Sequence, residues 1–161
     1  MRLSNGERKY LLGVALTLSE NGWTRLKWVA DLFGVRMPTA KEFLDSLTRK
    51  GLLDYQRRGS IFLTKRGGKL AEEEKRKYEV IVTFMTKCLL VEETTAKKNA
   101  LKILFDLDES VADRMYKFID FMTKCPSKPV FIEKFEQFIT DGSYEPCTFC
   151  PIIKDKGRQG T

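Results

Sequence analysis

A mainly α-helical fold with one small β-hairpin is predicted by three features of this 161-residue sequence. Over most of the chain, apolar residues recur three and four positions apart, which is the spacing of an amphipathic helix. Two short stretches, residues 51–55 and 60–64, instead alternate like strands, and Gln56-Arg57-Arg58-Gly59 between them has the composition of a hairpin tip. Glycine, proline and capping residues mark where helices should begin and end.

The N-terminal part of the chain has the element order of a winged helix-turn-helix. Ser4 and Glu7 have the spacing of a capping box and begin a first helix that should end near Asn21-Gly22. A second helix is expected over Thr24–Gly34, and a third has Pro38 in its first turn, where a missing N–H costs nothing. The apolar stripe of the third helix must face the core, which leaves its opposite face polar and exposed. The hairpin then forms the wing.

Helices are also predicted for the rest of the chain. A long helix should run from beyond Gly67-Gly68 to about Cys88, and Asp108 is expected to be the N-cap of a later one. The other expected helices cover about residues 92–107, 109–125 and 130–139. The predicted units are a winged-helix DNA-binding domain at 1–67, a helical domain at 68–125 and a cysteine-containing segment at 126–161.

Positive charge is concentrated in residues 24–66. This segment has ten Lys/Arg and four Asp/Glu, so 10 − 4 = +6 of the chain's net charge of +7. A basic module of this shape is typical of proteins that bind duplex DNA. The residues expected to reach base edges are Arg36, Thr39, Lys41 and Glu42, and those expected to contact phosphates are Arg25, Lys27, Arg49, Lys50, Arg57 and Arg58.

Composition excludes several classes of protein. Histidine is absent, which excludes Ser-His and Cys-His catalysis and every histidine-containing metal site. No catalytic constellation is present, so we expect no enzyme. No apolar run is long enough for a membrane helix, and the N-terminus does not resemble a signal peptide, which together predict a cytoplasmic protein. The Glu72-Glu73-Glu74 run predicts a solvated helix face, and Trp23 and Trp28 are interpreted as packing residues.

Four cysteines form a candidate site for a metal or a cluster: Cys88, Cys125, Cys147 and Cys150. Cys147 and Cys150 form a C-x-x-C motif, and both Cys88 and Cys125 end a copy of the pentapeptide Phe-Met-Thr-Lys-Cys near a predicted helix end. Four thiolates suit an iron–sulfur cluster or zinc. The alternatives are a thiol–disulfide switch of the C-x-x-C pair, and cysteines with no function beyond packing.

The order of motifs resembles the diphtheria toxin repressor family of metal-dependent transcription repressors. The likeness covers roughly residues 5–126. Its clearest segments are Val29-Ala30-Asp31-Leu32-Phe33-Gly34-Val35, Leu47-Thr48-Arg49-Lys50-Gly51-Leu52-Leu53 and Leu63-Thr64-Lys65-Arg66-Gly67. The resemblance implies that the helical unit is a dimerisation domain and that a homodimer binds a palindromic operator in double-stranded DNA.

The chain departs from this family where the family binds iron or manganese. The resemblance implies metal ligands at Tyr78 on the long helix and at Leu101, Leu104 and Phe105 on the next, none of which is a comparable ligand. The first helix, which also supplies ligands in the family, offers Arg8 and Lys9. We therefore expect the three apolar residues to pack in the core or in an interface. Some archaeal relatives look similar in carrying a cysteine-rich C-terminus, which Cys125, Cys147 and Cys150 match.

Two functional hypotheses follow from the sequence. The first is a homodimeric transcription regulator whose affinity for DNA is modulated by an iron–sulfur cluster or metal bound to cysteines, in iron or redox sensing. The second is a winged-helix adaptor that binds another protein and carries structural zinc or a redox switch at Cys147 and Cys150. Salt dependence separates them, because binding through several phosphates weakens steeply as salt rises.

Overall fold

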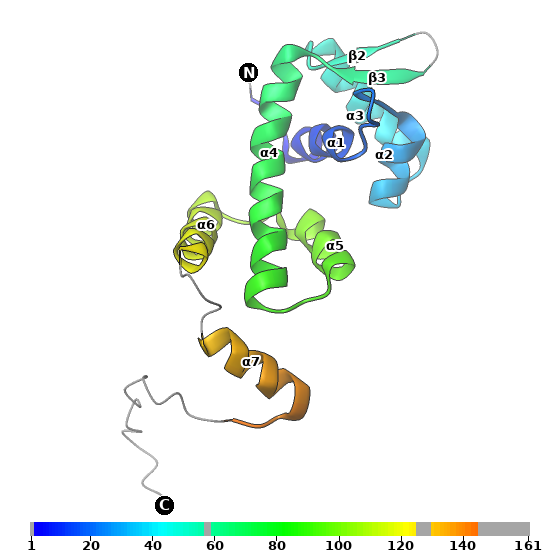
Figure 1. Cartoon of the computed structure of the whole chain (residues 1–161). Helices are drawn as coiled ribbons and strands as arrows, with labels where there is room; N and C mark the ends of the chain where they lie inside the picture. Colours follow the sequence, from blue (N-terminus) through cyan, green and yellow to red (C-terminus); the bar gives the residue numbers. More distant parts are fainter. Residues whose placement is uncertain (1, 57–58, 125–129, 145–161) are drawn as a thin grey trace, which may run out of the picture.

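The computed structural model of the chain describes residues 2–56, 59–124 and 130–144. As predicted, the chain is mainly helical with one small sheet, and a winged helix-turn-helix precedes a helical unit (Figure 1). The elements in chain order are α1 (Asn5–Leu16), β1 (Trp23–Arg25), α2 (Leu26–Phe33), α3 (Met37–Arg49), β2 (Leu53–Tyr55), β3 (Ser60–Leu63), α4 (Lys65–Thr83), the π-helical turn η1 (Phe84–Cys88), α5 (Glu93–Ile103), α6 (Glu109–Thr123) and α7 (Val130–Asp141).

The sheet has three antiparallel strands in the order β1-β3-β2, one more than the sequence predicted. β1 pairs with β3 through Thr24 and Ile61, and the Thr24 side chain is fully buried with its hydroxyl 2.8 Å from that of Thr17. The prediction that the second helix begins at Thr24 is therefore wrong, because the extended segment 23–25 gains a strand partner before α2 begins.

The first helix begins as predicted and ends earlier. The Ser4 hydroxyl accepts from the Glu7 amide at 3.2 Å, and the Glu7 carboxylate accepts from the Ser4 amide at 2.9 Å, which completes the capping box. α1 ends at Leu16 and not near residue 21, because the chain turns back towards β1, with the Ser19 amide donating to the Trp23 carbonyl at 2.8 Å.

The long helix α4 begins before the two glycines that were expected to precede it. The Thr64 hydroxyl accepts from the Gly67 amide at 3.0 Å and caps the helix, so Gly67 and Gly68 lie in its first turns. A Cβ at position 67 would lie 1.9 Å from the Leu52 carbonyl oxygen, so glycine permits α4 to pack against the turn before β2. The predicted unit boundary after residue 67 thus falls inside a continuous helix.

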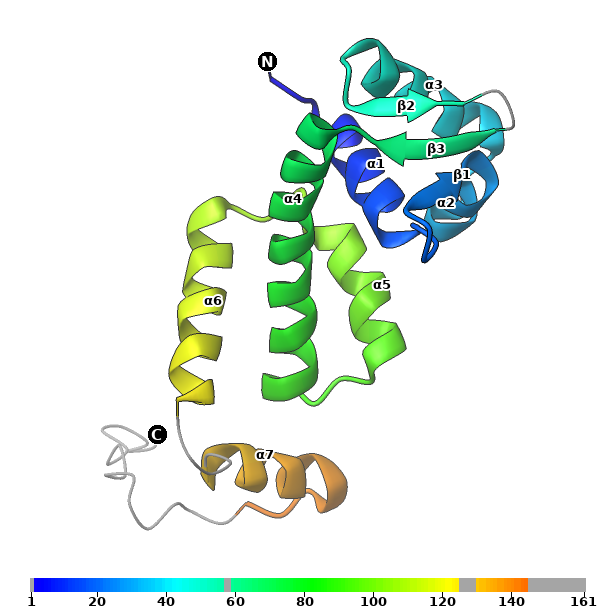
Figure 2. The same cartoon turned by 45° about the horizontal axis from the view of Figure 1, so that its top comes forward.

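Two apolar clusters form the core and share α1. The first lies between α1, α2, α3 and the sheet and includes Leu11, Val29 and Leu44. The second lies between α1, α4 and α5 and is built on Leu12 and Tyr78 with Ile81, Ala100 and Leu104. Figure 2 shows α4 between α5 and α6, with the winged-helix unit beside the N-terminal end of α4. α1 therefore ties the two units together.

The last two described helices expose apolar side chains. Both views show α7 beyond the ends of α4 and α6 (Figures 1 and 2).

The backbone at Asp108 has the predicted N-cap position, but its side chain makes no capping hydrogen bond to α6. Among the helices of the described ranges, none combines the length and the apolarity required to cross a bilayer.

Candidate DNA-binding surface and helix junction

The first two turns of α3 form an exposed polar face. Ala40, Leu44 and Leu47 are fully buried, and Phe43 stacks on Tyr10 with ring centroids 4.4 Å apart. This anchoring turns the other face of the helix to solvent, as the apolar periodicity predicted. The exposed residues of this face include Arg36, Thr39, Lys41 and Glu42.

The Lys41 side chain is exposed but paired with a carboxylate on its own helix. Its ammonium lies 2.6 Å from the Asp45 carboxylate, and this hydrogen bond raises the pKa of Lys41. No ion-pair or side-chain hydrogen-bond partner is found for Thr39 or Glu42 within the described part of the chain. The α3 face thus presents hydrogen-bond donors and acceptors to solvent.

Arg25, the last residue of β1, lies on a platform of two tryptophans. Its guanidinium carbon is 5.2 Å from the Trp23 ring centroid and 5.9 Å from that of Trp28, and the two indoles stack at 5.1 Å. The tryptophans, which the sequence analysis interpreted as packing residues, stack on each other and hold Arg25 through its cation–π contacts, but Trp28 is 38% exposed and lies outside the core clusters. Lys27 and Arg49 are exposed as well.

Lys50 has an ion-pair partner within the protein, and none is found for Arg25, Lys27 or Arg49 among the described residues. Its ammonium donates to the Glu7 carboxylate, which is buried and also accepts from the Ser46 hydroxyl at 2.8 Å. The Lys50 ammonium first, and then the Ser4 amide and Ser46 hydroxyl, lower the pKa of Glu7 to about 2. Lys50 thus joins the C-terminus of α3 to the start of α1. Arg57 and Arg58 at the predicted wing tip lie outside the described residues.

A second buried ion pair joins α1 to α4. Arg8 donates through Nε and Nη2 to the two carboxylate oxygens of Glu74, at 2.8 and 3.0 Å. The same guanidinium lies 5.6 Å from the Phe105 ring centroid, and the side-chain Nδ2 of Asn5 donates to the Phe105 backbone carbonyl at 3.0 Å. The prediction that Glu74 belongs to a solvated face is wrong, because its side chain is only 10% exposed and its charge is neutralised by Arg8.

The positions at which the resemblance implies metal ligands are apolar and packed. Tyr78 and Leu104 lie inside the second core cluster, and Leu101 and Phe105 pack against it, which confirms the prediction for the three apolar residues. Within the described ranges, no three His, Cys, Asp or Glu side chains gather as a metal site would require. We call the place where α1, α4 and α5 meet the helix junction. Because Arg8 binds both carboxylate oxygens of Glu74, the helix junction does not fit a divalent metal.

Of the four candidate cysteine ligands, only Cys88 is among the described residues. It is a free, buried thiol at the end of η1, and burial raises its pKa, which disfavours the thiolate that a metal needs. Cys125, Cys147 and Cys150 lie outside the described residues. In Figure 2 the C-terminal ends of α4, which η1 follows, and of α6 lie at the same end of the helical unit.

The ion pairs at Glu7 and Glu74 were missed at the level of sequence. The partners are 43 and 66 residues apart along the chain, so no periodic pattern links them. The one local signal was the capping box, which marked Glu7 as a residue bound at the start of a helix. It did not indicate that the same carboxylate would accept from α3.

Comparison with known proteins identifies the helical half of the chain. Residues 64–141 match the family model for "Iron dependent repressor, metal binding and dimerisation domain". No curated protein matches the chain in sequence. As predicted, the family is one of repressors and not of enzymes.

Solved structures of repressors share the fold. A manganese-dependent transcriptional repressor in complex with manganese matches with a TM-score of 0.60 and 23% identity, over 71% of this chain and 53% of its own length. IdeR of T. acidophilum matches with a TM-score of 0.61 and 18% identity, over 92% of this chain and 66% of its own. The manganese regulator SloR matches with a TM-score of 0.59 and 22% identity, over 74% of this chain and 56% of its own length. The chain thus spans about half of the first of these proteins. The chain thus matches a repressor-domain model over residues 64–141 and has the fold of these solved repressor structures.

Proposed function

We propose that the chain is a homodimeric transcription regulator that binds double-stranded DNA through α3. The observation that carries this proposal is the exposed polar face at the start of α3, held against a rigid core in a unit with most of the chain's positive charge. A helix so presented can enter the major groove with its first turns at the base edges. The family match of residues 64–141 to a repressor domain supports the same function.

Within this proposal, Arg36, Thr39, Lys41 and Glu42 read bases, and basic residues around them contact phosphates. Arg25, Lys27 and Arg49 are exposed and suit the phosphate role, as do Arg57 and Arg58 by their position in the sequence. Lys50 contributes less, because its ammonium is bound to Glu7. The Trp23 and Trp28 platform limits the freedom of Arg25, which lowers the entropy lost on binding.

Selection of a duplex from a random pool, followed by titration with wild-type protein and variants, tests DNA reading. Lys41→Ala is expected to relax base preference, at a cost of about 1–3 kcal/mol if Lys41 pairs with guanine. Lys75→Ala is the matched control, because Lys75 also pairs with a carboxylate four residues on, Glu79 on α4. The double variant of Arg57 and Arg58 should weaken binding to every duplex and flatten the salt dependence. Binding that is insensitive to salt would favour the adaptor hypothesis.

We further propose that the homodimer forms through the exposed apolar face of α6. Val111, Phe118 and Phe121 are exposed there, and Phe121 is 72% exposed in the single chain. An aromatic side chain this exposed is typical of a surface that binds another protein. A second copy is the expected partner, because the matched family model describes a dimerisation domain.

Sedimentation analysis of wild type and two variants tests the dimer. Phe121→Glu should shift the protein towards a monomer, whereas Met37→Glu should not. Met37 is the matched control because it is also an exposed apolar side chain, 51% exposed, but lies on α3. A wild-type monomer at micromolar concentration would remove the model of two half-sites on a palindromic operator.

In this proposal, the affinity for DNA responds to a metal or cluster bound by the cysteines, and not to a metal bound at the helix junction. The junction does not fit a divalent metal, whereas the chain retains Cys125, Cys147 and Cys150, which suit an iron–sulfur cluster or zinc. Metal and sulfide analysis of protein purified without oxygen distinguishes a cluster, zinc and bare thiols. Replacing Cys147 and Cys150 with Ser should abolish the bound cofactor and the response of DNA affinity to oxygen, while Cys88→Ser should alter neither, because the Cys88 thiol is buried.

A further inference from the structure

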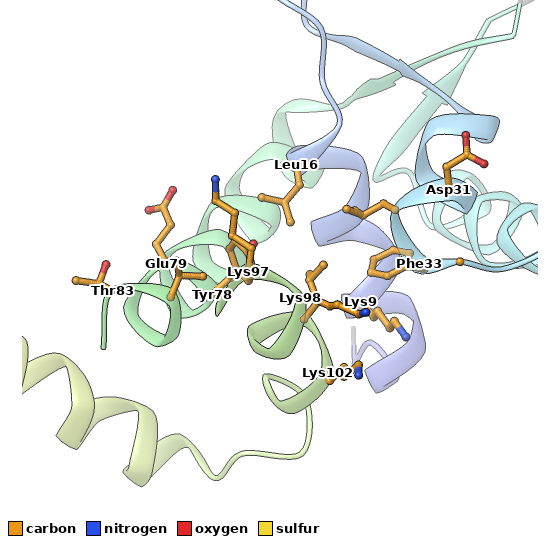
Figure 3. Close-up of a pocket in the computed structure, with 14 residues that line it drawn as sticks. Lys9, Leu16, Asp31, Phe33, Tyr78, Glu79, Thr83, Lys97, Lys98 and Lys102 are labelled. Carbon is orange, nitrogen blue, oxygen red and sulfur yellow. The ribbon is translucent and has the colours of Figure 1, made fainter. Parts of the chain in front are cut away.

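A cleft of about 800 Å³ opens between the winged-helix unit and the helical unit (Figure 3). Residues of α1, α2, α4 and α5 line it, so the cleft exists only when the two units are packed together. Its volume lies within the range of pockets that bind small molecules. None of the residues proposed above to read DNA bases lines this cleft.

One part of the lining is apolar. Leu16 of α1, Leu32 and Phe33 of α2, Val82 of α4 and Leu101 of α5 all contribute, and each of these side chains is half-buried. Their remaining surface is thus available to the apolar body of a ligand. Removing that surface from water would contribute to the free energy of binding.

The other part of the lining is basic. Four lysines and two acidic residues line the cleft, so 4 − 2 = +2. The acidic Glu79 is already paired with Lys75, with 3.7 Å between its carboxylate and the Lys75 ammonium. In Figure 3 the carboxylates of Glu79 and Asp31 point away from the side of the cleft at which Lys98 and Lys102 lie.

Two of the four lysines are occupied by contacts within the protein. Lys9 lies over the Phe33 ring, with its ammonium 4.9 Å from the ring centroid, and Lys97 is paired with Glu93. Lys98 and Lys102 have no ion-pair partner among the residues that the structure describes. They are four residues apart on α5, where like charges repel unless an anion lies between them.

We propose that this cleft binds a small amphipathic anion, with a carboxylate between Lys98 and Lys102 and an apolar chain or ring against Phe33 and Leu101. The inference goes beyond the proposed function and does not depend on it, because the binding needs no DNA. Such a ligand touches both units at once. It would therefore favour one relative placement of the two units, which is the property expected of an effector.

Titration of ¹⁵N-labelled full-length protein with decanoate tests the proposal, and decanol is the matched neutral probe. Decanoate should shift the amide signals of residues 32–34 and 97–102 in a saturable way, and added salt should weaken the binding. Decanol should bind at least tenfold more weakly. Equal binding of the two probes would overturn the proposal, and so would shifts confined to α6 and α7, whose apolar side chains are exposed.

Lysine variants provide the second arm of the test. Lys98→Met/Lys102→Met keeps the apolar stems, and it should lower the affinity for decanoate at least tenfold. Lys102→Glu alone should do the same. Lys117→Met is the matched control, because Lys117 is an exposed lysine on α6 outside the cleft, and it should bind decanoate as wild type does. The three lysines are exposed, so the variants should retain the wild-type spectrum. Unchanged affinity in the double variant would contradict the site.

Discussion

Arg8 of α1 and Glu74 of α4 form a two-point ion pair, with donor–acceptor distances of 2.8 and 3.0 Å, at the junction of the two units. The Glu74 carboxylate raises the pKa of Arg8, and Phe105 covers one side of the guanidinium. The pair places the Arg8 guanidinium, whose charge Glu74 neutralises, beside the positions at which the family resemblance implies metal ligands. It holds α1 against α4 without any bound ion.

Breaking this ion pair on one side should destabilise the fold. Glu74→Gln leaves the Arg8 charge at a largely buried site, and we expect a loss of about 2–3 kcal/mol in the free energy of unfolding. The double variant Arg8→Met/Glu74→Leu should recover most of that loss, because it removes both charges and keeps the packing. Urea denaturation measures both values. Equal stability of Glu74→Gln and wild type would show that the pair contributes nothing.

Manganese should leave the thermal stability of the protein unchanged. A ligand that binds only the native state raises the unfolding midpoint, but among the described residues no three His, Cys, Asp or Glu side chains gather to hold Mn²⁺, and Arg8 binds both carboxylate oxygens of Glu74. Thermal unfolding of the Cys147→Ser/Cys150→Ser variant, which lacks the C-x-x-C thiols, should give the same midpoint with millimolar Mn²⁺ and with chelator. A midpoint that rises with Mn²⁺ in that variant would contradict our interpretation of the junction.

Acid should destabilise the protein through Glu7. Its pKa is about 2 in the folded protein against an ordinary value of 4.5, so the unfolded chain takes up its proton first as the pH falls. The stabilisation from Glu7 is therefore complete above about pH 4.5 and is lost as the pH falls towards about 2. Glu7→Gln should be less stable than wild type at pH 7, by about 1.5–3 kcal/mol.

The difference in the free energy of unfolding between Glu7→Gln and wild type, measured by denaturation across this pH range, separates the contribution of Glu7 from those of the other carboxylates. Glu92 also has a pKa of about 2, because the amides of Thr94 and Thr95 donate to it, but it titrates in both proteins. The difference in stability should narrow as the pH falls below 4.5. A constant difference would mean that the Glu7 charge has no part in it.

Adjacent glycines in α4 should respond oppositely to alanine. Gly67→Ala places a methyl group against the Leu52 carbonyl oxygen, so α4 must move away from the turn before β2, at a cost of more than about 2 kcal/mol. Gly68→Ala meets no atom within 4 Å and should stabilise the protein by about 0.5–1 kcal/mol, because alanine favours a helix. Thermal denaturation of the two variants checks the prediction, which is wrong if both change stability in the same direction.

The sequence by itself predicted features that depend on neighbouring residues. The Ser4–Glu7 capping box, Pro38 in the first turn of α3 and the buried stripe of α3 are all present, because the hydrogen bonds and the side-chain spacing that define them lie within a few residues. The wing followed from alternation in two short segments. The chain's departure from the family's metal ligands also needed no structure, because residue types alone exclude imidazole and carboxylate at those positions.

The tertiary structure decided the features that depend on distant partners. Strand β1 has only three residues, too few for a periodic pattern, and its register is set by β3. Glu74 belongs to an acidic run in the sequence, and only the packing of α1 against α4 places Arg8 beside it. The cleft with Lys98 and Lys102 exists because four helices converge there. Packing brings charges from distant parts of the chain together in a low dielectric, and a linear pattern does not record that proximity.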